Sequence, residues 1–148
     1  MDGSKREKIT LKIRLDYRGN GRGGRRLFGG KNITDSAEEI REQKVSFFRN
    51  VPMQGVAVND IDANAEVYAV IDDSSGEQVA YAPIILTVTA ENIENVLQLI
   101  MQEEFRKVEV IEPQTLALDR GDMERLLFRI SEELRKYHRS LERKWANR

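Results

Sequence analysis

The ten residues Lys8–Tyr17, "KITLKIRLDY", alternate between apolar and polar side chains. One side of an extended chain carries Ile9, Leu11, Ile13 and Leu15, and the other carries Lys8, Lys12, Arg14 and Asp16. This period of two predicts a β-strand with one face buried and the other in water. The apolar face of such a strand needs a second layer, which we expect helices elsewhere in the chain to provide.

The segments that follow are alternately helical and extended in pattern. Helices are predicted at 34–50, capped by Asp35, and at 91–105, and a strand is predicted at 78–90. The segment 55–73 predicts one long strand or two short ones, and 107–113 a further strand. Pro83 cannot donate to a ladder, so it predicts a bulge or an edge position. This order predicts an α+β fold, a ferredoxin-like antiparallel sheet with helices on one face.

A long helix is expected at 120–146. Its apolar residues are spaced four, three, four, three, four and four apart, which is nearly a heptad seam: Met123, Leu127, Ile130, Leu134, Tyr137, Leu141 and Trp145. The helix would be roughly 40 Å long, whereas a domain of this size has a radius of gyration near ~15 Å. We therefore expect it to project from a single 148-residue domain and to contact a second copy through Tyr137, Leu141 and Trp145. The alternative is packing on the chain's own sheet.

The composition narrows the class of protein. The chain has 148 residues, of which 40% are hydrophobic and 33% charged, as in soluble globular domains. Its longest apolar runs are far shorter than the ~20 residues of a membrane span. The charged N-terminus has no apolar segment of a secretory signal. The chain has no cysteine, which excludes disulfides and cysteine nucleophiles and fits a cytoplasmic location. No cofactor is expected.

Charge is unevenly distributed along the chain. Residues 1–54 have a net charge of +6, residues 55–124 of −12 and residues 125–148 of +5, within a total of −1. Such segregation can steer a polyanion to one face or draw copies of the protein together. The alternative is that basic and acidic elements simply neighbour each other once folded.

The stretch Tyr17–Lys31, "YRGNGRGGRRLFGGK", is rich in glycine and arginine. It contains a literal G-x-G-x-x-G, but "RRLFGG" follows where a dinucleotide fold needs a helix, so that interpretation is rejected. An anion site is predicted instead, in which guanidinium groups and a lysine bind phosphate and Phe28 stacks on a base. Its cationic residues are Arg18, Arg22, Arg25, Arg26 and Lys31. The alternative is a flexible connector at 17–31.

An acidic run suggests a weak metal site. Asp60, Asp62 and Glu66, together with Asn64, would share one face of an extended segment and could hold Mg²⁺. Ala65 and Ile71 stand where a calcium loop requires glycine and glutamate, so an EF-hand is excluded. A solvated strand face is the alternative. His138 is the only histidine and has no partners for a triad or a metal site, so the chain is predicted not to be an enzyme.

Residues 85–116, "ILTVTAENIENVLQLIMQEEFRKVEVIEPQTL", resemble the C-terminal extension, called WCX, of WYL-domain transcriptional regulators. The matching positions are Thr87 and Val88, Glu91 to Gln102, Val108 to Ile111, and Glu112 with Pro113. The resemblance implies a ferredoxin-like module that serves oligomerisation and ligand-responsive regulation of nucleic-acid binders. No WYL core or helix-turn-helix accompanies it here.

The sequence thus predicts a non-enzymatic binding module that forms a homo-oligomer, with a dimer expected. Its basic segments would bind a nucleic acid or an acidic protein. No association with a membrane is expected. Two alternatives stay open, namely a metal-assisted hydrolase built on the acidic strand face and a purely structural assembly protein.

Overall fold

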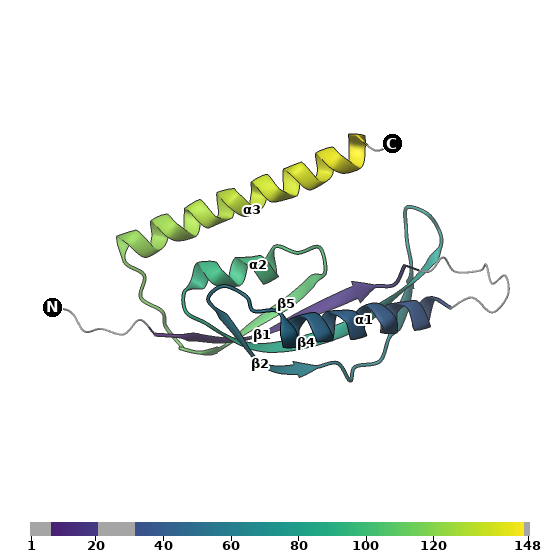
Figure 1. Ribbon diagram of the computed structural model, residues 1–148, viewed down its shortest axis with the longest axis horizontal. Coiled ribbons are helices and arrows are strands. Elements are labelled where there is room, and N and C mark those ends of the chain that lie inside the picture. Colours follow the sequence, from purple (N-terminus) through teal and green to yellow (C-terminus); the bar gives the residue numbers. More distant parts are fainter. Residues whose placement is uncertain (1–6, 21–31, 147–148) are drawn as a thin grey trace.

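A five-stranded antiparallel sheet forms the centre of the computed structural model, which describes residues 7–20 and 32–146 (Figure 1). The strands are β1 (Ile9–Arg18), β2 (Val56–Asp62), β3 (Tyr68–Ile71), β4 (Gln78–Ala90) and β5 (Phe105–Glu112). Their order is β2-β4-β1-β5, and β3 also pairs with β4. The predicted α+β class is confirmed. The ferredoxin-like order stays a prediction, because the sheet contains a fifth strand.

The alternation along β1 places its apolar residues in the core. Ile9, Leu11, Ile13 and Leu15 are all buried, and they cluster with apolar residues of β4 such as Leu86. Helical residues from α1 (Ile33–Asn50), the short 3₁₀ helix η1 (Ile93–Val96) and α2 (Leu97–Ile100) complete this cluster. The helices therefore cover the face of the sheet on which these residues lie.

The first helix runs the full length of its pattern, but its cap differs from the expectation. Asn32 is the N-cap, and its side-chain oxygen accepts a hydrogen bond from the backbone N–H of Asp35 at 2.7 Å. Asp35 lies in the first turn, where its negative charge is favourable. The helix continues to Asn50, as the predicted range 34–50 requires.

The helix expected over 91–105 is much shorter. It consists of η1 and the four-residue α2, because the chain must turn back to begin β5 at Phe105. Pairing with β1 already starts before that strand, since Asp16 donates its backbone N–H to the carbonyl of Glu104 at 2.9 Å. Leu99 is nevertheless buried in the core, so an apolar residue of this segment packs against the sheet although the helix is short.

Two short strands form in 55–73, and the gap between them accommodates Pro83. β4 lies between two neighbours in the sheet, so Pro83 is not on an edge strand. However, β2 pairs with residues 85–90 of β4 and β3 with residues 78–81. The missing N–H of Pro83 therefore falls where no strand pairs on that side, and β1 pairs past it without a bulge.

The helix α3 (Arg120–Ala146) has the predicted bounds. It begins with reciprocal capping, since the N–H of Asp122 donates to the Asp119 side chain and the N–H of Asp119 to the Asp122 side chain. Figure 1 shows that α3 crosses over α2, on the side away from the sheet. None of its 27 residues is buried. The expected long C-terminal helix is confirmed, whereas its projection from the domain stays a prediction.

Candidate functional site

A line of exposed and half-exposed apolar residues runs along α3. We call it the α3 stripe, comprising Met123, Leu127, Ile130, Leu134, Tyr137, Leu141 and Trp145. Leu127 and Trp145 are each 67% exposed, and Tyr137 is 57% exposed. Isolated surface leucines are ordinary, whereas contiguous exposed apolar patches are a common feature of interaction surfaces.

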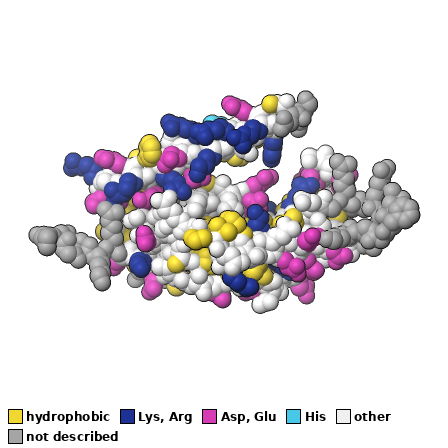
Figure 2. Space-filling model, in the orientation of Figure 1, with side chains coloured by type: hydrophobic (Ala, Val, Ile, Leu, Met, Phe, Trp, Pro, Cys, Tyr) yellow, Lys and Arg dark blue, Asp and Glu magenta, His cyan; other side chains and the backbone are white. Residues whose placement is uncertain are grey.

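The two halves of α3 differ in charge. Residues 120–134 have a net charge of −1, and residues 135–146 a net charge of +4. Figure 2 shows that lysine and arginine side chains gather along this helix, with His138 among them. His138 is exposed and tilts against Tyr137 with ring centroids 6.4 Å apart. The basic half of the helix carries cationic side chains that can meet an anionic partner.

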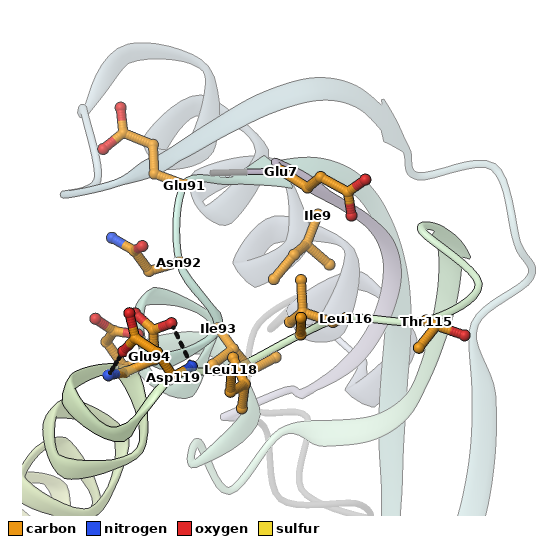
Figure 3. Close-up of a pocket in the computed structure, with 12 residues that line it drawn as sticks. Glu7, Ile9, Glu91, Asn92, Ile93, Glu94, Thr115, Leu116, Leu118 and Asp119 are labelled. Atoms are coloured by element: carbon orange, nitrogen blue, oxygen red, sulfur yellow. Dashed lines mark hydrogen bonds between the residues drawn. The ribbon is translucent and has the colours of Figure 1, made fainter. Parts of the chain in front are cut away.

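A cavity of about 730 Å³ lies where α3 begins (Figure 3). It is formed by the start of β1, the turn into η1 and the linker 113–119. Carboxylates line it from all of these directions, namely Glu7, Glu91, Glu94, Asp119 and Asp122, and apolar residues line it as well, namely Ile9, Ile93, Leu116 and Leu118. We call it the acidic cavity. Its chemistry suits a cationic group attached to an apolar one.

Arg125 ties the beginning of α3 to this cavity. Its guanidinium pairs with Asp122 one turn earlier and lies 3.5 Å from the carboxylate of Glu94 in η1. The main contacts of α3 with the rest of the molecule are with η1 and α2. The first turns of the helix are therefore held in place, while its basic half extends beyond these contacts.

The face of the sheet opposite the helices carries a buried carboxylate. Asp16 belongs by alternation to this outer face, yet it is only 2% exposed. The Arg14 guanidinium binds it through Nε at 2.8 Å and Nη2 at 3.1 Å, and Arg106 lies 3.9 Å away. Tyr68 donates its hydroxyl to the same carboxylate. Stacking of Tyr68 on Tyr81, with Arg106 above the Tyr81 ring, completes the Asp16 cluster.

The pKa values of Arg14 and Tyr68 are raised within this cluster. The hydrogen bond to Asp16 raises the pKa of Arg14, so its guanidinium is held even more firmly in the charged form. Desolvation by burial, followed by the hydrogen bond to Asp16, raises the pKa of Tyr68. The phenol therefore stays protonated and remains a donor. The cluster holds two guanidinium groups, 42% and 37% exposed, beside each other on the surface.

The acidic run Asp60–Glu66 does not form one face. β2 ends at Asp62, so Asn64 and Glu66 lie beyond the strand, and the expectation of a shared extended face is wrong. Asp60 and Asp62 line a groove on the outer face of the sheet together with Lys12, Arg14 and Lys107. Within the described ranges no three His, Cys, Asp or Glu side chains are grouped to hold a metal.

Of the predicted anion site, the structure describes only Arg18. Its guanidinium lies 3.7 Å from Asp72 and is 52% exposed. Arg22, Arg25, Arg26, Phe28 and Lys31 lie outside the described residues. The glycine-rich segment leaves β1 beside the first turns of α1, where Asn20 donates its backbone N–H to Ser36 at 2.8 Å.

The sequence patterns did not predict the Asp16 cluster or the acidic cavity. The register of β1 with β5 brings Arg106 to Asp16, and a hairpin brings Tyr68, so the cluster depends on pairings far apart in the chain. The sequence does contain one indication of the cluster. Asp16 lies near the end of a strand whose other charged outer-face residues are cations. The cavity depends on the course of the linker, for which the sequence has no periodic pattern.

Comparison with protein-family models, curated proteins and solved structures finds no significant match to this chain. The resemblance of residues 85–116 to the WCX extension therefore stays a prediction. Across the described ranges, no helix combines the length and the apolar character needed to cross a membrane.

Proposed function

We propose that the protein is a non-enzymatic binding module that self-associates through the α3 stripe and binds a nucleic acid through its basic segments. One observation carries this proposal: α3 extends over 27 residues without burying a single one. A helix this exposed obtains little stability from its own core, and most helical stability in proteins comes from packing of an apolar face. A partner that covers the stripe supplies that packing.

The choice of nucleic acid rests on where the cations lie. The outer face of β1 carries Lys12, Arg14 and Arg18, and the chain then enters the arginine-rich segment. Lys107 pairs with Arg14 across the strands, and Arg106 lies over an aromatic ring. Cations that follow a strand beside stacked tyrosines suit a phosphate backbone with unstacked bases, which is the usual chemistry of single-strand binding.

Light scattering tests the self-association. We expect the intact chain to have the mass of a dimer and Leu127→Asp to have the mass of a monomer. Phe128→Asp is the matched control, because Phe128 is similarly exposed, at 63%, but lies outside the stripe. A monomeric mass for the unaltered chain at high concentration would contradict the proposal.

Fluorescence anisotropy with a labelled single-stranded oligonucleotide tests the nucleic-acid part. Affinity should fall steeply with salt, and replacing Arg18, Arg22, Arg25 and Arg26 by alanine should reduce the slope of log affinity against log salt by about 3. Replacing the same four residues by lysine should keep the slope, because the charge is retained. Absence of binding even at low salt would leave an acidic protein or simple assembly as the role.

The hydrolase alternative gains no support from the carboxylates of β2. Asp60 and Asp62 share their groove with Lys12 and Arg14, whose positive charges compete with any metal ion there.

A further inference from the structure

We infer that two copies pair their α3 helices in antiparallel orientation, so that Trp145, Arg143 and Lys144 of each copy enter the acidic cavity of the other. This inference rests on the proposed self-association and specifies its geometry. Three independent features of the described residues support it: the spacing of the stripe, the division of charge along α3 and the lining of the cavity.

The spacing of the α3 stripe is symmetric for an antiparallel pair. With a two-fold axis beside residue 132, Met123 of one copy faces Leu141 of the second copy. In the same register Leu127 faces Tyr137, and Ile130 faces Leu134. Six apolar layers are filled without a polar residue, and the axis passes near the middle of a helix that spans 120–146. The two helices therefore overlap over almost their whole length.

The charge on α3 favours the same orientation. Antiparallel pairing brings the basic half, with a net charge of +4, against the weakly acidic first half of the second copy. Parallel pairing would instead set the two basic halves side by side, which charge repulsion opposes. The helix dipoles also align favourably when the ends are opposed.

The acidic cavity lies where the second copy's helix would end. In this register Trp145 of the second copy reaches the level of Asp119, which lines the cavity. Ile93 and Leu116 belong to the apolar lining of the cavity, and Glu91 and Glu94 are among its carboxylates (Figure 3). In the pair, the apolar lining would accommodate the indole and the carboxylates would meet Arg143 and Lys144. A buried aromatic side chain removes about 150–250 Å² of surface from water, which enlarges an interface made by two helices alone.

Cysteine crosslinking tests the orientation, because the chain contains no cysteine of its own. Ser131 and His138 lie one heptad apart and so occupy the same side of α3. In the antiparallel register Ser131 lies beside its own symmetry mate, so Ser131→Cys should form a crosslinked dimer with a short bismaleimide. His138→Cys should remain uncrosslinked. Parallel helices would set both positions level with their counterparts and treat them alike, so equal crosslinking through Ser131→Cys and His138→Cys would overturn the inference.

A charge exchange and a fluorescence measurement test the cavity. Glu91 is exposed at the cavity rim, and Glu91→Lys should weaken the dimer by roughly fivefold. Combining it with Lys144→Glu should restore the affinity, whereas Glu77→Lys, in the turn before β4, should have no effect. Trp145 is the only tryptophan, so its emission should shift to shorter wavelength as the dimer forms.

Each outcome separates the inference from the proposed function. A dimer by light scattering that fails to crosslink through Ser131→Cys, or whose Trp145 emission stays that of a solvated indole, would overturn the antiparallel docking while self-association stands. A chain that is monomeric at every concentration would overturn both.

Discussion

Asp16 shows how a single residue on the wet face of a strand becomes part of the interior. The strand pattern assigns its side chain to water, but Tyr68 from a neighbouring hairpin and two arginines enclose it. A buried carboxylate is tolerated only when it is paired and hydrogen-bonded, and Asp16 meets both conditions. The alternation correctly gave its face, whereas its burial followed from pairings that alternation does not encode.

Asp16→Asn should destabilise the protein by about 2 kcal/mol, because the amide keeps the volume but removes the charge that holds both guanidinium groups. Urea unfolding followed by circular dichroism measures this change. Asp62→Asn is the matched control, since Asp62 is exposed on the same outer face and should shift the midpoint little. Equal midpoints for the two variants would mean that the cluster adds no stability.

Tyr68 should make stability fall at alkaline pH. Its pKa is raised above the ordinary value of 10.0, so the folded chain holds this proton more tightly than the unfolded chain does. The resulting stability is fully present below pH 10 and is lost as the pH rises through the raised folded value. Denaturant midpoints measured from pH 8 upward should decline above pH 10. Tyr68→Phe should flatten the decline, although Tyr17, whose pKa is raised by burial, will leave part of it.

Among the helices and strands, those with a strongly periodic sequence were predicted well. Those whose length depends on contacts with the rest of the fold were not. β1, β4 and α3 follow from alternation or a heptad repeat. α2 is shorter than its pattern because the chain must turn toward β5 at Glu104, which no local property specifies. Pro83 was expected at a bulge or an edge because it has no N–H to donate. The sequence pattern does not show that a gap between β2 and β3 leaves this position without a partner strand.

Gly19 fixes how the end of β1 meets α1, and replacing it should cost stability. A Cβ there would lie 2.7 Å from the backbone nitrogen of Ala37 and 3.0 Å from the carbonyl oxygen of Ile33, and neither can move independently of the helix. Gly19→Ala should therefore destabilise the protein by roughly 1–3 kcal/mol in thermal or urea unfolding.

Gly121→Ala is the control for Gly19→Ala. Its Cβ would meet only the flexible Arg125 guanidinium at 3.3 Å and the Asp119 side chain at 3.4 Å, in the first turn of a helix that alanine favours. It should leave stability unchanged or slightly increased. A similar loss for both variants would mean that the close approach of β1 to α1 is not what makes glycine necessary at position 19.

For the whole molecule, the chain divides into a sheet with a complete core and a helix without one. Ile13, Leu15 and Leu86 are fully buried, whereas α3 has no buried residue. The two parts should therefore differ in how their stability depends on a second copy. The sequence predicts this contrast in outline. The strands and the first two helices already contain enough apolar residues to form one core, and the α3 stripe adds further apolar residues after them.

Hydrogen exchange should reveal this contrast as a dependence on protein concentration. Amides of β1 and β4 should be protected at every concentration, because their core is complete within one chain. Amides in the second half of α3 should exchange rapidly in dilute solution, since a helix without tertiary packing frays, and should become protected as dimers form. Leu127→Asp should abolish the increase in protection, and Phe128→Asp should retain it. If α3 is equally protected at all concentrations and in both variants, the helix is stable on its own and the argument for a partner along its apolar stripe fails.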